Sequence, residues 1–152
     1  MRVWRIDRMG RNPLEGAGGM HVAGRWNARG RRIVYASAHL SLAILEKLVH
    51  VNPDQVPDNL AAIEIDLPDG NNLIDVLPPA SLPRDWRDQP PSRSTQQLGE
   101  AWLADPARPP VLVVPSAVVP REVNYLLNPA HPGAGAWTVV HVEPFSFDPR
   151  LV

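Results

Sequence analysis

Proline is the feature that most constrains this chain, because 18 of its 152 residues are proline. Each proline fixes its own φ angle and lacks a backbone N–H, so it interrupts helices and central strands. The sequence therefore predicts short secondary-structure elements joined by long connections. At this length the chain is most economically one domain, residues 1–152, that is large enough to bury a hydrophobic core.

The composition argues against several classes of function. Fifteen Lys and Arg residues against 16 Asp and Glu give a net charge of -1, which does not favour direct binding of nucleic acid. The absence of cysteine excludes disulfides and Cys-ligated zinc, and the five histidines show no metal-binding spacing, so we expect no metal. Without a signal-peptide core or a stretch of roughly 18 apolar residues, we expect a cytoplasmic protein that does not enter a membrane.

Apolar patterns predict an α+β fold with a mixed sheet. Strands are expected at 3–6, 20–23, 33–36, 60–67, 111–114 and 137–142, with 60–67 half-buried and 111–114 central. Residues 38–51 predict a helix that is apolar on almost every side and therefore largely buried, with Ser37 as its N-cap. Ser94 and Gln97 form a capping-box pattern for a second helix.

A candidate ligand-binding stretch begins at Gly24, which allows the backbone to approach a ligand closely. The guanidinium of Arg25 can hold a phosphate or diphosphate through two parallel hydrogen bonds. Trp26 and Tyr35 could stack on a flat ring while the tyrosine hydroxyl bonds a polar edge. The alternative is a surface arginine paired with an acid, beside aromatic residues of the core.

Glu46 is the second candidate, because its carboxylate lies on an apolar face of the predicted buried helix. Burying a carboxylate alone is costly, so it requires a partner or a ligand. In glycosyl transfer a carboxylate can stabilise a transition state that resembles an oxocarbenium ion, and it can hold a ribose hydroxyl. The alternative is a structural glutamate paired with an arginine or lysine. Ser116 lacks a Gly-x-Ser-x-Gly frame, so it suits a ligand-bonding role better than that of a hydrolase nucleophile.

Several short motifs occur here in the order seen in RES-domain proteins, and the chain resembles that family over nearly its whole length. The motifs are WRI at 4–6, GRWN at 24–27, IVYA at 33–36, LE at 45–46, VPS at 114–116 and NYLLNP at 124–129. The family is named for an arginine, a glutamate and a serine. By this resemblance they are Arg25, Glu46 and Ser116.

The resemblance implies a fold similar to the ADP-ribosyltransferase core of diphtheria-like toxins, with helices flanking a mixed sheet. It also implies a toxin of a type II toxin–antitoxin pair that consumes NAD+ as a substrate, releases nicotinamide and passes ADP-ribose to phosphate or water. No metal is needed, because nicotinamide leaves as a neutral ring from a cationic one. The implied partner is an Xre-like antitoxin that covers the active site, and the toxin could be a homodimer within that complex.

The same resemblance assigns roles to individual residues. Arg25 would hold the diphosphate of NAD+, Tyr35 would stack beside nicotinamide, and Glu46 would hold the ribose and stabilise the developing cation. The other expected binding residues are Arg5 as a second positive group, Trp26, Asn27, Ser116 as a ligand-bonding hydroxyl, and Glu122 and Asn128 as residues that shape the pocket.

Two alternatives remain open at this point. A mono-ADP-ribosyltransferase acting on one cellular protein would use the same residues and differ only in its acceptor. A non-catalytic nucleotide-binding module predicts that loss of Arg25 or Glu46 weakens binding without changing NAD+ levels. A toxin that cuts RNA is disfavoured by the neutral charge and the lack of a basic stripe.

Overall fold

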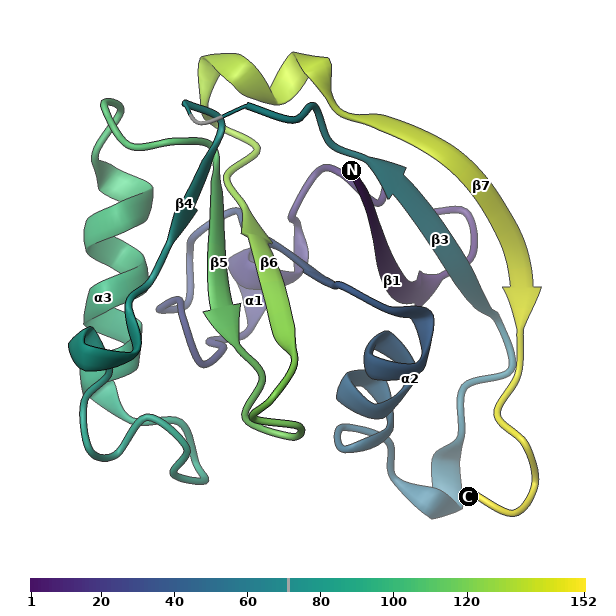
Figure 1. Cartoon of the computed structure of the whole chain (residues 1–152). Helices are drawn as coiled ribbons and strands as arrows, with labels where there is room; N and C mark the ends of the chain where they lie inside the picture. Colours follow the sequence, from purple (N-terminus) through teal and green to yellow (C-terminus); the bar gives the residue numbers. More distant parts are fainter. Residues whose placement is uncertain (71) are drawn as a thin grey trace.

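The computed structural model describes residues 1–70 and 72–152, and in them a seven-stranded mixed sheet is flanked by α-helices (Figure 1). The strands are β1 (Arg2–Arg8), β2 (Val34–Ser37), β3 (Leu60–Asp66), β4 (Ile74–Val76), β5 (Val111–Pro115), β6 (Val123–Leu127) and β7 (Thr138–Phe145). The α-helices are α1 (Gly18–His21), α2 (Leu40–Leu48) and α3 (Arg93–Ala104). The predicted α+β class, with a mixed sheet and flanking helices, is confirmed.

Proline marks the connections as expected. The 3₁₀-helices η1 (Pro53–Gln55), η2 (Pro79–Ser81) and η3 (Pro132–Ala136) each begin at a proline. A proline suits the first position of a helix, where its missing N–H costs no hydrogen bond. None of the described helices is long and apolar enough to cross a membrane.

The sheet has the strand order β4-β5-β6-β2-β1-β3-β7, and its weakest junction lies between β2 and β1. These two strands share one residue pair, Trp4 with Ser37, whereas β1 and β3 pair over their whole length. The sheet therefore divides into two halves, with β4, β5 and β6 on the left and β1, β3 and β7 on the right (Figure 1). One core cluster, which includes Val3, Val34, Ile65 and Leu127, contains residues from both halves.

Helix α2 lies beside this junction. Leu42 and Ala43 are buried, and Ala43 belongs to a cluster with Ile6 and Ala62. The prediction that the helix is buried on almost every side is wrong, because these are its only buried residues and Leu45 is 37% exposed. The N-cap prediction is wrong, because Ser37 is the last residue of β2 and its hydroxyl donates to Asn124 Oδ1 at 2.7 Å. The helix instead begins after His39, whose side chain makes no capping hydrogen bond.

Some local predictions also differ from the structure. Residues 18–21 form α1 instead of a strand at 20–23, and β4 was not expected in its proline-rich stretch. The hydroxyl that caps α3 belongs to Ser92, which accepts from the Thr95 N–H at 3.3 Å, while Ser94 donates to Asp85. Most of β3 is buried on both faces instead of half-buried. The prediction that 111–114 form a central strand is confirmed, because β5 pairs with β4 on one side and with β6 on the other.

Candidate functional site

A cavity of about 690 Å³ lies beside the junction of the two half-sheets. This volume is within the range of about 300–1,000 Å³ that is typical of small-molecule sites. It is lined by six of the predicted site residues, namely Arg5, Arg25, Trp26, Asn27, Tyr35 and Glu46. Pro115 and Ala117, the two neighbours of Ser116, line it as well. The structure thus brings most of the predicted residues to one place.

Glu46 is held on one side by two polar side chains. Its Oε1 accepts hydrogen bonds from Ser116 Oγ at 2.7 Å and from Asn124 Nδ2 at 2.5 Å. Within the described part of the chain, no residue donates to the other oxygen, Oε2. The alternative of a structural ion pair does not hold, because the partners of the carboxylate are a hydroxyl and an amide.

Both partners of Glu46 are themselves fixed in orientation. The Ser116 hydroxyl accepts from the N–H groups of Val118 at 3.1 Å and Val119 at 2.9 Å, so its single proton is free to point at Glu46. The Asn124 amide accepts from Ser37 through Oδ1, which turns its NH₂ group toward the carboxylate. Hydrogen bonds that fix the partners of a functional carboxylate also hold the carboxylate itself in one position.

Arg25 is bound along one edge of its guanidinium. Its Nη1 donates to the carbonyl oxygens of Trp86 at 2.6 Å and Asp88 at 3.1 Å. No described residue accepts from Nε or Nη2, so this second edge is available to a ligand. Burial lowers the pKa of Arg25 and the negative charge of Glu46 opposes that shift, yet a guanidinium stays protonated near neutral pH. The alternative of a surface arginine paired with an acid does not hold, because the partners of Arg25 are backbone carbonyls.

Tyr35 is fixed at the back of the cavity. Its hydroxyl donates to Asn27 Oδ1 at 2.7 Å and accepts from the Trp26 N–H at 3.1 Å. A Cβ atom at Gly24 would lie 2.6 Å from that hydroxyl and 2.5 Å from Asn27 Oδ1. Glycine is therefore required here for contact with Tyr35 and Asn27. Gly24 also lines the cavity, and the expectation that it allows a ligand to approach the backbone stays a prediction.

The indole of Trp26 belongs to the core. Trp26 is 2% exposed and packs in a cluster with Trp102 and Leu112. The structure therefore does not support the prediction that Trp26 stacks on a ligand ring. The stacking role of Tyr35 remains a prediction.

We expect Tyr35→Phe to lower the free energy of unfolding by about 1–3 kcal/mol, because Asn27 and the Trp26 N–H lose their partner. Burial also raises the pKa of Tyr35 well above its usual value. The protonated Tyr35 hydroxyl therefore makes its full contribution to the free energy of unfolding below the unfolded-state pKa of about 10. That contribution is lost as the pH rises toward the higher pKa of the folded state. Urea titrations should thus show the parent losing more stability than the variant above about pH 10. Tyr125→Phe is the matched control for the lost hydrogen bonds at neutral pH, because the Tyr125 hydroxyl has no hydrogen bond within the described residues.

Arg5 is already neutralised by a residue that sequence reasoning missed. Its Nε and Nη2 donate to Asp7 Oδ2 at 3.1 and 2.6 Å, and its Nη1 donates to the Tyr35 carbonyl at 3.2 Å. Asp7, Lys47 and Asn124 line the same cavity and were not predicted. Asn124 lies in the NYLLNP motif, which is the only sequence signal that could have identified it.

Two predicted residues do not join this cluster. Asn128 follows the far end of β6 from Asn124, donates to the Leu103 carbonyl at 3.3 Å and accepts from the Ala130 N–H at 3.1 Å. It therefore fixes the chain after β6 instead of shaping the cavity. Glu122 contributes its carbonyl, which accepts from the Ser116 N–H at 3.0 Å, so it supports the site through its backbone.

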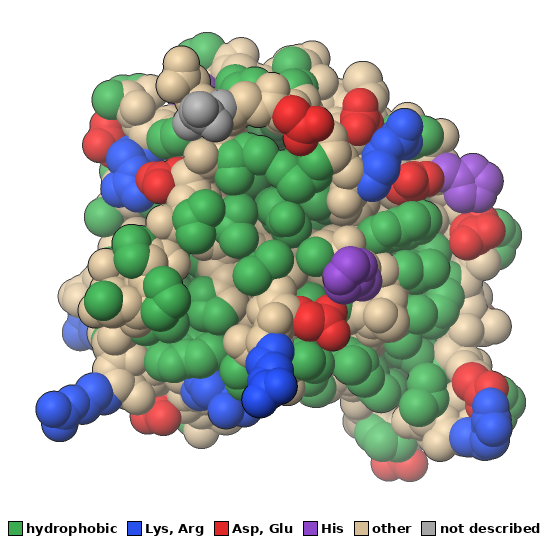
Figure 2. Space-filling model, in the orientation of Figure 1, with side chains coloured by type: hydrophobic (Ala, Val, Ile, Leu, Met, Phe, Trp, Pro, Cys, Tyr) green, Lys and Arg blue, Asp and Glu red, His purple; other side chains and the backbone are tan. Residues whose placement is uncertain are grey.

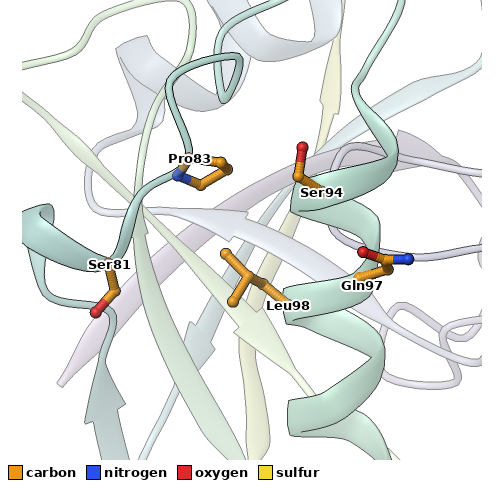
Figure 3. Close-up of a pocket in the computed structure, with 5 residues that line it drawn as sticks. All are labelled: Ser81, Pro83, Ser94, Gln97 and Leu98. Atoms are coloured by element: carbon orange, nitrogen blue, oxygen red, sulfur yellow. The ribbon is translucent and has the colours of Figure 1, made fainter.

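A second, smaller cavity of about 310 Å³ lies between η2 and α3. It is lined by Ser81, Pro83, Ser94, Gln97 and Leu98 (Figure 3). These side chains carry no formal charge, so this cavity offers no counterpart to a diphosphate. In the described ranges, no group of three or more His, Asp and Glu residues is placed to hold a metal ion. The cavity that contains Arg25 and Glu46 is therefore the candidate site.

Nearly the whole chain is similar to known proteins. A family model described as the RES domain matches residues 2–148. A "Prs ADP-ribosylating toxin" of Sphingobium sp. (strain YBL2) is 39% identical over 154 residues, covering 98% of this chain and 95% of that protein. A "Toxin Res" of Pseudomonas putida (strain KT2440) is 39% identical over 153 residues and 99% of both chains. A "Toxin Res" of Photorhabdus laumondii is 40% identical over 139 residues, or 90% and 86% of the two chains.

The fold also resembles a solved structure. A chain in the crystal structure of the M. tuberculosis MbcT–MbcA toxin–antitoxin complex matches with a TM-score of 0.72. The match covers 95% of this chain and 84% of that chain, at 17% sequence identity. At that identity the likeness concerns the fold alone, and it agrees with the predicted mixed sheet and its flanking helices.

Proposed function

Because this chain belongs to the RES-domain family, we propose that it is the toxin of a toxin–antitoxin pair, and that it cleaves the nicotinamide–ribose bond of NAD+ and transfers ADP-ribose to phosphate or water. The relative that is named an ADP-ribosylating toxin supports a reaction that uses NAD+. The observation that carries the proposal is a carboxylate, Glu46, fixed by two donors in the same cavity as the free edge of the Arg25 guanidinium.

Each charged group matches one part of NAD+. The Nε–Nη2 edge of Arg25 binds the diphosphate, since a guanidinium edge matches two phosphate oxygens. Oε2 of Glu46 faces the nicotinamide ribose, where it accepts from a ribose hydroxyl and stabilises positive charge in the transition state. Holding both ends of the substrate against rigid groups lowers the entropic cost of reaching that state.

The proposed reaction needs only NAD+ and the acceptor. As the bond between ribose C1′ and the ring nitrogen breaks, both of its electrons pass to the nitrogen, and nicotinamide leaves uncharged. An oxygen of the acceptor then forms a bond to C1′. When the acceptor is water, its proton passes to solvent, and when it is phosphate dianion no proton has to leave. Lys47 lines the cavity and adds a positive group for an anionic acceptor.

A second candidate function differs only in the acceptor. The relative from Sphingobium is named for ADP-ribosylation of Prs, and its 39% identity extends over 98% of this chain. This observation favours transfer to one cellular protein by the same residues.

A chromatographic assay of purified protein with NAD+ separates these functions. NAD+ loss with release of nicotinamide in phosphate or in buffer alone supports the phosphorylase or glycohydrolase. Stable NAD+ in both solutions, with ADP-ribose on one protein when lysate is added, supports the protein ADP-ribosyltransferase. No turnover in any of the three conditions would contradict both and leave a nucleotide-binding module.

We also propose that this chain binds an Xre-like antitoxin, which covers the cavity. Both proteins would act in the cytoplasm. The structural neighbour is a toxin crystallised with its antitoxin, which supports a partner of this kind. The antitoxin is expected to abolish NAD+ turnover when it is mixed with this chain, and full turnover within a stable complex would contradict a covered cavity.

A further inference from the structure

The strand β7 is a long and exposed edge of the sheet. It pairs with β3 on one side and stands last in the strand order, as the outer arrow on the right of Figure 1 shows. Val139, Val140 and Val142 on this strand are 37%, 46% and 46% exposed. Figure 2 shows hydrophobic side chains on this side of the molecule, with charged groups beside them. Proteins normally cover or interrupt such an edge, because its free backbone groups and apolar surface attract another strand.

The directions of the backbone groups of β7 follow from its pairing. The Leu67 N–H donates to the carbonyl of Met1, the residue before β1. The backbone N–H and C=O groups of odd-numbered residues in β3 therefore point toward β1, and those of even-numbered residues point toward β7. His141 and Glu143, opposite even-numbered residues of β3, therefore face β3, while Val142 directs its N–H and C=O outward. Pro144 lies at an outward position too, where its missing N–H costs β3 no hydrogen bond.

The side chains of β7 divide between the two faces of the sheet. Val142 lies opposite Ile63 and extends the apolar face of the core. His141 and Glu143 lie on the other face, and their Nε2 and Oε2 atoms are 3.5 Å apart. The exposed edge therefore has an apolar face and a face that carries one basic and one acidic side chain.

We propose that β7 pairs with β7 of a second copy of this chain, antiparallel, about a two-fold axis at Val142. In this register Val142 exchanges two backbone hydrogen bonds with Val142 of the partner subunit. His141 then lies opposite Glu143 of the partner subunit, and Glu143 lies opposite His141 of the partner subunit. The two valines meet on the apolar face.

The side chains of His141 and Glu143 select this register over its neighbours. Moving the axis by one residue in either direction keeps the outward backbone groups aligned. An axis at His141 places the two histidines opposite each other, and an axis at Glu143 places two carboxylates opposite each other, which is unfavourable. Among these three registers, only the axis at Val142 places each Glu143 carboxylate opposite an imidazole that can donate a hydrogen bond to it, and this self-complementarity is the reason for choosing a second copy as the occupant.

Disulfide trapping tests the register directly, because the chain contains no cysteine. All variants are made with Glu46→Gln as well, so that a toxic activity does not limit production. Paired Cα atoms at the axis are about 5.5 Å apart, within the range of a disulfide. Val142→Cys is therefore expected to form a covalent dimer under mild oxidation. Val76→Cys is the matched control, since Val76 is also exposed, at 59%, but lies on β4 at the opposite edge of the sheet.

Two further cysteine variants report the other registers. In the proposed pairing the two copies of position 141, or of position 143, are about 7–8 Å apart along a diagonal, too far for an unstrained disulfide. His141→Cys and Glu143→Cys are therefore expected to crosslink much less than Val142→Cys. Preferential crosslinking of either variant would overturn the register.

Sedimentation velocity tests the pairing without a covalent bond. We expect Val142→Lys to weaken dimerisation at least about tenfold, because two ammonium groups meet at the axis. Val76→Lys should leave the dimer intact. His141→Glu should weaken the dimer, because two carboxylates then lie opposite each other, and adding Glu143→His to it should restore the dimer, because each carboxylate again lies opposite an imidazole. Circular dichroism confirms that each variant is folded.

Several outcomes would overturn the proposal. They are a monomeric parent chain without Val142→Cys crosslinking, or a dimer that Val142→Lys does not affect. A monomeric parent whose binding to the antitoxin is lost in Val142→Lys, but not in Val76→Lys, would instead assign β7 to the antitoxin.

Discussion

Glu46→Gln is expected to lower the kcat for NAD+ cleavage by about 10²–10³-fold, the scale seen when one electrostatic contact to a transition state is removed. Glutamine has the shape of glutamate, and its amide oxygen can still accept from Ser116 and Asn124. The substitution therefore removes the negative charge while it keeps the packing and the hydrogen bonds around Oε1. KM should change less than kcat, because the charge acts mainly in the transition state.

The measurement is the initial rate of nicotinamide release at several NAD+ concentrations. Glu15→Gln is the matched control, since Glu15 is an exposed residue paired with Arg32. It should leave both constants unchanged. A Glu46→Gln variant that folds normally and keeps kcat within about threefold of the parent would contradict a role for this carboxylate in the transition state.

Arg25→Lys is expected to raise the KM for NAD+ by about 10–10²-fold, although it preserves the positive charge. The guanidinium serves two partners, since Nη1 holds the carbonyls of Trp86 and Asp88 while the opposite edge is available to the diphosphate. A lysine ammonium has no second edge, so it can hold the 86–88 segment or the substrate, but not both in the same geometry.

The effect of Arg25→Lys is measured by the same kinetics and by the binding of ADP-ribose, which contains the diphosphate but no nicotinamide. Both the KM for NAD+ and the Kd for ADP-ribose should rise together. Arg84→Lys, an exposed position before the same segment, serves as the control. An unchanged Kd for ADP-ribose would show that the diphosphate binds elsewhere.

The fold was predictable from sequence wherever the local residue pattern determines the secondary structure of a segment. Alternating apolar residues located β1 and β3, and the nearly all-apolar pattern located α2. Predictions failed where contacts with residues distant in sequence determine the structure. β4 has only three residues and exists because it can pair with β5, and Ser37 became part of β2 because Asn124 lies beside it. No local periodicity contains that information.

The candidate site shows the same division. The cost of burying a lone carboxylate correctly singled out Glu46, yet its partners Ser116 and Asn124 are 70 and 78 residues away in sequence. Trp26 was expected at the ligand because aromatic side chains suit stacking, but its indole fills the space against α3 instead. Residue chemistry thus identified the reactive groups, and only the folded structure showed what holds them.

The single residue pair between β1 and β2 has a mechanical consequence for the cavity. Glu46 lies on α2, which packs through Ala43 against Ile6 of β1 and Ala62 of β3, whereas its donors come from β6 and from the turn after β5. The hydrogen bonds of this carboxylate therefore link the two halves of the sheet. Arg25 is bound to the 86–88 segment, which leads into α3 beside the half that contains β4, β5 and β6. A rotation of β1, β3 and β7 about the junction would carry α2 with it and draw Glu46 away from Ser116 and Asn124, so these two hydrogen bonds fasten the halves of the sheet together at the cavity.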